Sequence, residues 1–283
     1  RPEASLPPRR VPNRMTEQES HPERPNLPAT GNARSQSNSL RSLLARWLDF
    51  LYPPSCILCR VPLKKGRYLC QSCCEDLPRI EQPYCMKCGE NIEGLVPEDV
   101  LCTHCRGVDS FFDFARSVTS AEGPANEIMH AYKYGRQIHL HRELALLMEE
   151  LWSDPRLSVQ KNPPWVVVPV PLHWRRERWR WFNQSYEIAK TLAQQCNLSC
   201  QKALRRTRNT SQQALLDRGH RLANLQGAFQ LSPRERRLET TRDKPVLLID
   251  DVFTTGSTAE ECARVLKEEG GAEKVVVLTV LRG

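Results

Sequence analysis

The segment 246–283 constrains the fold of this chain more than any other. It contains two apolar runs, 246–249 and 275–280, which are typical of buried strands. Between them, apolar residues recur at helical spacing over 259–266, and Gly270 with Gly271 supplies a stop. This order predicts a strand, a helix and a second strand parallel to the first. The loop after the first strand then lies at the carboxyl edge of the sheet, where open α/β sheets bind ligands.

That loop has a composition suited to a phosphosugar. We expect the first strand to stop at Asp250 and Asp251. Small residues follow, namely Thr254, Thr255, Gly256, Ser257 and Thr258. Hydroxyl and N–H groups ahead of a helix bind phosphate, whereas carboxylates repel it and instead accept hydrogen bonds from sugar hydroxyls or hold a hydrated Mg²⁺. A P-loop is excluded because its lysine is missing. The alternative is an ordinary capped helix preceded by acids that bind nothing.

These residues resemble the phosphoribosyl-pyrophosphate (PRPP) signature of type I phosphoribosyltransferases, which is an apolar strand, two acids and T-T-G-x-T. The resemblance implies an α/β fold with a mainly parallel sheet flanked by helices. It also makes Asp250 and Asp251 the candidate catalytic residues.

The second informative feature is the cysteine content, because eight of the twelve cysteines form four C-x-x-C pairs. The pairs are Cys56 with Cys59, Cys70 with Cys73, Cys85 with Cys88, and Cys102 with Cys105. Two such pairs build a tetrahedral Cys₄ zinc site with no open position, so we expect two structural zinc ions. Sequential and crossed pairing both fit the spacing, Cys74 can replace Cys73, and we expect His104 to be a surface residue without a metal.

Disulfides or redox chemistry are the alternative use of these cysteines. No run reaches membrane-spanning length, and the first residues lack the apolar core of a signal peptide. Together with a nucleotide-type α/β domain, this favours metal binding in a reducing compartment, the cytoplasm.

Composition divides the chain into four parts. Residues 1–39 are polar and rich in proline, which predicts a disordered tail. Over 40–54 leucines recur at helical spacing, so we expect a short amphipathic helix that docks on its own domain or lies on a membrane surface. The zinc module occupies 55–108. The packed α/β domain occupies 109–283, with further strands at 111–118 and 165–168 and helices at 126–134, 140–151 and 183–195.

Basic residues indicate anionic partners, since the net charge is +8 and the isoelectric point is near 9.0. Arg175, Arg176, Arg178 and Arg180 alternate with Trp174, Trp179 and Trp181 in what we interpret as a loop. Such a loop binds single-stranded nucleic acid or covers a nucleotide, or else its tryptophans pack inward. Lys133, at a predicted helix end, either meets phosphate or is solvated.

The chain as a whole resembles the ComF family of predicted phosphoribosyltransferases with an N-terminal double zinc ribbon. The resemblance rests on K-Y-G at 133–135, V-P-V-P-L-H at 168–173, F-N-Q at 182–184, and Gln213, Arg221, Asn224, Gly227 and Phe229, besides the cysteines and the PRPP signature. The family commonly has glycine before F-N-Q, where this chain has Trp181.

The resemblance implies a role for each element. Asp250 and Asp251 contact the ribose hydroxyls of PRPP, and residues 254–258 cradle its 5′-phosphate. The segment 205–221 forms a lid. The pyrophosphate loop consists of Pro169, Val170, Pro171, Leu172 and His173.

The implied activity is Mg²⁺-dependent phosphoribosyl transfer with pyrophosphate release, in competence and DNA uptake. Candidate partners are PRPP, single-stranded DNA and a competence helicase. The alternative is a non-catalytic protein that binds single-stranded DNA or senses PRPP. No residue pattern identifies the acceptor.

Overall fold

The computed structural model describes residues 54–283 except 65, 95–96, 98, 158–163 and 210–223. All of these described residues belong to one compact unit, residues 52–283. The predicted tail, most of the predicted amphipathic helix and most of the predicted lid lie outside the described residues.

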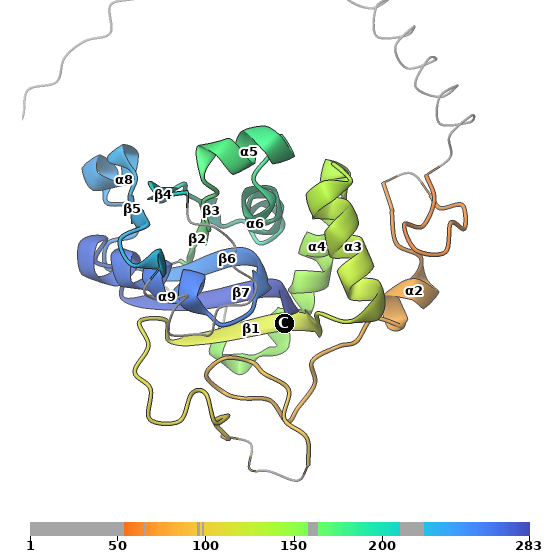
Figure 1. Ribbon diagram of the computed structural model, residues 1–283, viewed down its shortest axis with the longest axis horizontal. Helices are drawn as coiled ribbons and strands as arrows, with labels where there is room; N and C mark the ends of the chain where they lie inside the picture. Colours follow the sequence, from red (N-terminus) through yellow and green to blue (C-terminus); the bar gives the residue numbers. More distant parts are fainter. Residues whose placement is uncertain (1–53, 65, 95–96, 98, 158–163, 210–223) are drawn as a thin grey trace, which may run out of the picture. The chain divides into compact units, whose positions relative to one another are not determined.

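A five-stranded sheet with strand order β1-β7-β6-β2-β3 forms the centre of the unit, and each neighbouring pair is parallel (Figure 1). Its strands are β1 (Phe114–Ser120), β2 (Val166–Pro169), β3 (Ser199–Cys200), β6 (Pro245–Phe253) and β7 (Lys274–Arg282). The apolar runs of β2, β6 and β7 are buried throughout. Each such side chain contributes about 2 kcal/mol on burial, which explains why these runs form the central strands. The expected parallel α/β sheet is confirmed.

Helices cover both faces of the sheet. The described helical elements are α2 (Gln71–Glu75), α3 (Gly123–Tyr134), η1 (Ile138–Leu140), α4 (His141–Met148), η2 (Glu149–Ser153), η3 (Pro155–Leu157), α5 (Trp174–Arg180), α6 (Gln184–Gln195), α8 (Pro233–Leu238), α9 (Ser257–Arg264) and the π-helical turn η4 (Val265–Glu269). One core cluster joins α3, α4 and α6 to alternate residues of the sheet, such as Leu247. A second cluster joins α9 to residues of the opposite face, such as Leu248. A two-stranded antiparallel pair, β4 (Leu204–Arg206) with β5 (Phe229–Leu231), extends the second cluster.

Two predicted boundaries are wrong. The strand predicted over 246–249 continues through both acids, because Asp250 still pairs with Thr279 and Phe253 with Arg282. Ladder hydrogen bonds are made by the backbone, so polar side chains need not end a strand. The basic stretch interpreted as a loop contains the helix α5, which begins where the His173 side chain accepts a hydrogen bond from the Arg175 N–H.

The crossover directions make the position between the carboxyl ends of β2 and β6 the topological switch point of the sheet. From β2 the chain passes through α6 to the neighbouring strand β3, over the face that α3, α4 and α6 cover. From β6 it passes through α9 to β7, which lies on the other side of β6 from β2, and this connection covers the opposite face. Neighbouring strands whose connections diverge in this way leave a gap at their carboxyl ends, which is where α/β sheets bind ligands.

Candidate functional site

The eight paired cysteines form two clusters in the structure. The first contains Cys56, Cys59, Cys70 and Cys73, and the second contains Cys85, Cys88, Cys102 and Cys105. The segments that carry them, 55–80 and 81–108, are called the first and the second ribbon. The first C-x-x-C pair therefore shares a cluster with the second, and the third shares one with the fourth, which is the sequential pairing. None of the twelve cysteines, all of which are described, forms a disulfide.

The geometry of both clusters fits zinc. The Sγ atoms of Cys59 and Cys70 are 3.6 Å apart, and those of Cys88 and Cys102 are 3.7 Å apart. A tetrahedron with Zn–S bonds of about 2.3 Å has sulfur–sulfur edges of about 3.8 Å. Backbone N–H groups also approach the sulfurs, for example Cys102 N to Cys85 Sγ at 3.3 Å. The two Cys₄ clusters therefore fit two structural zinc ions.

Cys74 and His104 lie outside both Cys₄ clusters. The Cys74 Sγ accepts a hydrogen bond from Arg79 at 3.5 Å, so it belongs to the docking contacts of the first ribbon. The His104 side chain is 68% exposed, and its Nδ1 lies 3.6 Å from a carboxylate oxygen of Glu90. Since His104 and Glu90 also group with Cys102, they flank the second cluster.

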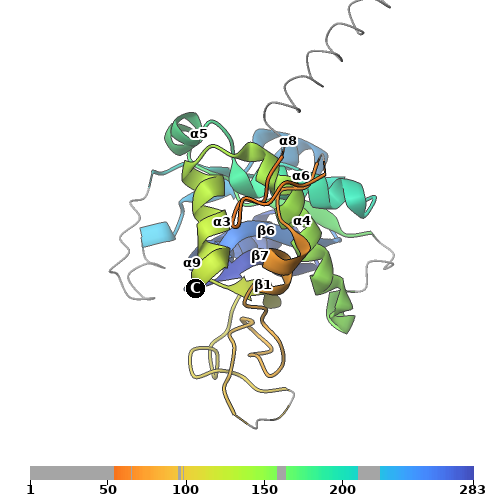
Figure 2. The ribbon, with the colours of Figure 1, turned by 90° about the vertical axis from the view of Figure 1, so that its right-hand side faces the viewer.

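The first ribbon docks on α4 (Figure 2). The buried Glu143 carboxylate accepts hydrogen bonds from Arg67 Nε at 3.0 Å and from the Tyr68 N–H at 2.7 Å. Arg79 forms a bidentate pair with Glu150 at 2.7 and 2.8 Å. Apolar residues of this ribbon join the core cluster of α3, α4 and α6.

The second ribbon packs along the edge strand β1 (Figure 1). The Ala115 N–H donates to the Lys87 carbonyl oxygen at 2.7 Å, and Lys87 Nζ donates to the Phe112 carbonyl oxygen at 2.7 Å. Three of its cysteines, Cys85, Cys88 and Cys105, belong to the core cluster of α9. The two ribbons therefore attach to opposite faces of the sheet.

The acid pair lies at the carboxyl end of β6, beside two helices. Asp250 accepts a hydrogen bond from the Ser185 hydroxyl of α6 at 2.8 Å. Asp251 pairs with Lys133 of α3 at 3.0 Å, and both side chains of that pair are largely buried. Desolvation, followed by the charge of Asp251, raises the pKa of Asp250 to about 7. Asp250 can therefore hold a proton near neutral pH, and the acid pair already has one cation, Lys133, beside it.

The residues predicted as the pyrophosphate loop lie next to this pair. β2 ends at Pro169, which pairs with Ile249, and the Val170 N–H donates to the Ile249 carbonyl oxygen at 2.9 Å. Asn183 Nδ2 holds the Val170 carbonyl oxygen at 3.1 Å. His173 is buried, and desolvation together with the neighbouring arginines lowers its pKa. Pro171 and Leu172 are half-buried between these residues.

The small-residue segment 254–258, called the loop 254–258, consists of the turn after β6 and the first two residues of α9. Gly256 is the N-cap of α9 with φ +77°, a left-handed conformation that favours glycine. A Cβ at this position would lie 2.7 Å from the Phe253 ring, so space also requires glycine. The hydroxyls of Thr255 and Ser257 are 3.0 Å apart, and Thr254 is exposed while Thr258 is half-buried. The loop thus presents polar groups ahead of a helix, as an anion site requires.

The tryptophans of α5 and its end do not pack inward. Trp174, Trp179 and Trp181 are 55%, 63% and 72% exposed. Trp181 has φ +73° as the C-cap of α5, a left-handed conformation that favours glycine. The four arginines differ, because Arg175 and Arg178 are exposed and Arg176 is half-buried. Arg180 is buried, with Nη1 3.2 Å from Gln184 Oε1, so of the four arginines predicted to contact nucleic acid it is the least accessible.

Two residues with central contacts were missed by the sequence reasoning. Ser185 directly follows the F-N-Q motif and bonds Asp250, so the motif itself was the available signal. Arg282 bridges the second ribbon and the loop 254–258, and no local pattern marks it.

Together, fold and clusters define a class: an α/β domain of the type I phosphoribosyltransferase type with an N-terminal double zinc ribbon. Residues 47–106 match the family model of the double zinc ribbon domain. The DNA utilization protein YhgH of Escherichia coli is 31% identical over 78% of this chain and 93% of its own length.

Two further relatives carry names related to competence. Competence protein F of Haemophilus influenzae is 28% identical over 77% of this chain and 93% of its own length. Competence protein ComFC of Bacillus subtilis is 26% identical over 78% of this chain and 86% of its own length. The chain belongs to the ComF family, as its sequence motifs predicted.

Proposed function

We propose that the switch point between β2 and β6 binds PRPP and that the protein transfers the phosphoribosyl group to an acceptor. The observation that carries this proposal is the convergence of three elements at one switch point. These are the acid pair near the carboxyl end of β6, the loop 254–258 after it, and the turn at Val170 after β2, which is the parallel neighbour of β6. Each element matches one part of PRPP: hydroxyls, pyrophosphate and 5′-phosphate.

The chemistry requires the departure of pyrophosphate from the anomeric carbon as a nucleophile arrives. Asp250 and Asp251 would accept hydrogen bonds from the ribose 2- and 3-hydroxyls, and the N-terminus of α9 would hold the 5′-phosphate. Lys133, 3.0 Å from Asp251, adds positive charge beside the pair. When bound with PRPP, Mg²⁺ would supply charge neutralisation to the leaving pyrophosphate. The carboxylate oxygens suit this hard cation.

The biological setting that we propose is DNA uptake or utilization in the cytoplasm. The names of the relatives refer to competence and DNA utilization. Eight thiols arranged for metal rather than for disulfides suit a reducing compartment. Within the described residues, none of the helices has the length and apolarity needed to cross a bilayer.

Calorimetry with PRPP and Mg²⁺, followed by an assay of pyrophosphate release with bases, amines and oligonucleotides, tests this function. Asp250→Asn with Asp251→Asn should abolish turnover and weaken PRPP binding at least about tenfold. The exposed Asp243, just before β6, provides a control for each single substitution, because Asp243→Asn also removes one carboxylate, at the opposite end of the same strand. Absence of PRPP binding by the native protein would refute the proposal.

A second candidate function, the binding of single-stranded DNA, has its own observation. Tyr134 and Trp179 are exposed with ring centroids 6.1 Å apart, and the guanidinium of Arg136 lies 4.5 Å from the Trp181 ring centroid. These four residues are called the aromatic platform. Exposed rings with arginines stack bases without sequence preference, and each stacked base contributes about 1–3 kcal/mol. A competence helicase would then be a partner acting on the same strand.

Binding of a fluorescent oligo(dT) measures this function. Trp179→Ala with Trp181→Ala should weaken binding at least about tenfold. Trp174→Ala is the matched control, because it removes an equally exposed ring from the other end of α5. Equal losses in both variants, or binding that does not depend on salt, would exclude the platform as the binding surface.

A further inference from the structure

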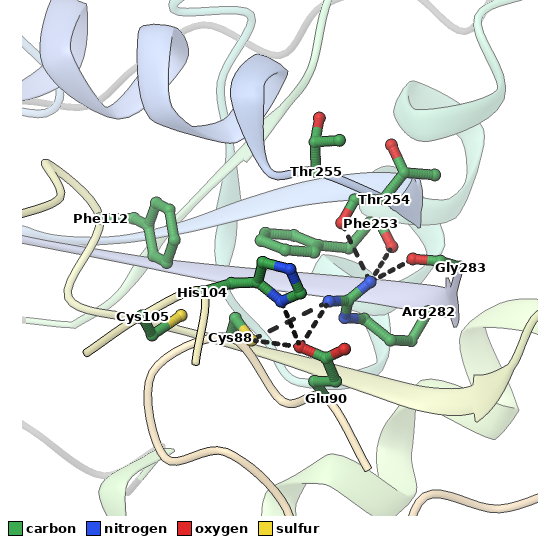
Figure 3. Close-up of a pocket in the computed structure, with 10 residues that line it drawn as sticks. All are labelled: Cys88, Glu90, His104, Cys105, Phe112, Phe253, Thr254, Thr255, Arg282 and Gly283. Carbon is green, nitrogen blue, oxygen red and sulfur yellow. Dashed lines mark hydrogen bonds and ion pairs between the residues drawn. The ribbon is translucent and has the colours of Figure 1, made fainter. Parts of the chain in front are cut away.

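Arg282, at the end of β7, lies between the second ribbon and the loop 254–258 (Figure 3). Its Nη1 donates to the carbonyl oxygens of Thr254 at 3.0 Å and Phe253 at 3.4 Å. Its Nη2 lies 3.5 Å from the Glu90 carboxylate and 3.9 Å from the zinc-cluster sulfur of Cys88. The side chain is only 14% exposed. One guanidinium therefore contacts both modules.

The orientation of the two carbonyl groups has a consequence for the loop. In a trans peptide, the carbonyl group of one residue and the N–H of the next point in opposite directions. The Phe253 carbonyl oxygen also accepts a hydrogen bond from the Gly283 N–H at 2.9 Å, so the carbonyl group that depends on Arg282 is that of Thr254. Because Arg282 holds the Thr254 carbonyl group, the Thr255 N–H is turned away from the guanidinium and is available to a phosphate at the N-terminus of α9.

Aromatic packing joins the same two modules. The Arg282 guanidinium lies 5.3 Å from the Phe253 ring centroid, and that ring makes an edge contact with Phe112 at 5.8 Å. Phe112 is held in turn by Lys87 of the second ribbon. These rings line a cavity of about 490 Å³, and the other residues of its wall include Glu90, His104, Thr254 and Thr255 (Figure 3). The cavity wall is thus shared by ribbon and loop.

We infer that Arg282 is a positioning residue through which the second ribbon orients the loop 254–258 for phosphate. It acts through the loop backbone and does not itself touch the ligand. This inference deepens the proposed function, on which its ligand rests, by making the second ribbon part of the phosphate site.

The first ribbon provides a matched arginine. Arg79 also connects a zinc-ribbon sulfur, that of Cys74, with a carboxylate of the α/β domain, that of Glu150. The contact of Arg79 with the α/β domain is made to Glu150 on η2 and not to the loop 254–258. A substitution of Arg79 therefore disturbs a similar bridge without reaching the phosphate site.

Hydrogen exchange followed by mass spectrometry tests the inference without a ligand. In Arg282→Gln, amides of the peptide covering 254–258 should exchange at least about tenfold faster than in the native protein, because the hydrogen bond that restrains the Thr254 carbonyl group is lost and this backbone opens more often. In Arg79→Gln they should exchange at the native rate. Both variants should hold two zinc ions per chain. Native exchange in Arg282→Gln would overturn the inference.

Binding of ribose 5-phosphate supplies the second measurement. Arg282→Gln should weaken it about tenfold or more, Arg282→Lys should recover part of the loss, and Arg79→Gln should leave it unchanged. If the native protein binds no ribose 5-phosphate while exchange responds as expected, the proposed function fails and the positioning role stands. If Arg282→Gln loses the second zinc, Arg282→Lys decides, since it keeps a cation beside Glu90. Native exchange and native affinity in that variant would refute the role.

Discussion

The two ribbons share their metal chemistry and differ in what they support. Each offers four cysteines in tetrahedral spacing. The first attaches to α4 through the buried Glu143 and joins the core of α3, α4 and α6. The second joins the α9 core and reaches the loop 254–258 through Arg282. The same small module therefore acts as a stabiliser in one place and as a wall of the candidate site in the other.

The difference follows from the faces of the sheet. Helix α9 and the loop before it lie on the face that the second ribbon covers, so a change in this ribbon reaches the loop directly. On the other face, the first ribbon contacts α4, which carries none of the candidate site residues. Each prediction tests whether this asymmetry has measurable consequences.

The largest effect is expected from the cysteines themselves. Cys56→Ser and Cys85→Ser each remove a fully buried ligand, one from each ribbon. Each variant should lose one zinc and about 4 kcal/mol or more of stability, because a ribbon of this size lacks a core of its own. Elemental analysis and denaturation measure both losses. Only Cys85→Ser should also speed exchange over 254–258, and equal exchange in both variants would break the comparison.

A glycine pair gives the next largest effect. Gly256→Ala places a methyl group 2.7 Å from the Phe253 ring at φ +77° and should cost about 2–4 kcal/mol. Gly66→Ala in the first ribbon has φ +87° with no neighbouring atom within 4 Å, so only the conformational cost of about 1–2 kcal/mol remains. Chemical denaturation measures both. Ribose 5-phosphate binding should disappear in Gly256→Ala alone.

Substitution of Asp250 should raise the free energy of unfolding, whereas the substitutions in the ribbons should lower it. The folded-state pKa of Asp250, about 7, exceeds its usual 3.8, so the native state binds a proton more tightly than the unfolded state. This proton binding stabilises the native state at low pH, and the stabilisation is lost as pH rises through 7. Asp250→Asn should therefore be about 2–4 kcal/mol more stable than the native protein at pH 8.5.

Urea denaturation from pH 6 to 8.5 checks this sign. The advantage of Asp250→Asn should be nearly constant above about pH 7.5 and should shrink as pH falls from 7 to 6. An advantage that is constant with pH would show that Asp250 does not titrate in this range.

The smallest loss of stability is expected for Glu143, the residue of α4 that the first ribbon contacts. Glu143→Gln keeps an oxygen for the Tyr68 N–H and loses the charge that pairs with Arg67. It should cost about 1 kcal/mol and leave loop exchange and zinc content unchanged. Thermal denaturation and exchange measure these quantities. Faster exchange at 254–258 would mean that the first ribbon also supports the loop.

Local pattern was sufficient for most elements and failed at two kinds of position. The helices α3 and α6 follow from apolar periodicity, because their buried residues repeat at helical spacing, and the strand β7 follows from a continuous apolar run that is buried throughout. The end of β6 was placed too early, since its last residues are polar yet keep their ladder pairs. α5 was missed because its exposed tryptophans produce no apolar stripe.

By itself the sequence determined the chemistry of this protein: two Cys₄ zinc ribbons, a parallel α/β sheet, and a loop composition suited to a phosphosugar. These features depend on residue types at short spacing, which a single chain displays directly. Only the tertiary structure decided which partners meet. Lys133 meets Asp251, and Arg282 meets Cys88 across 194 positions of sequence. Such contacts depend on how the faces of the sheet are covered, and short-range spacing carries no record of that.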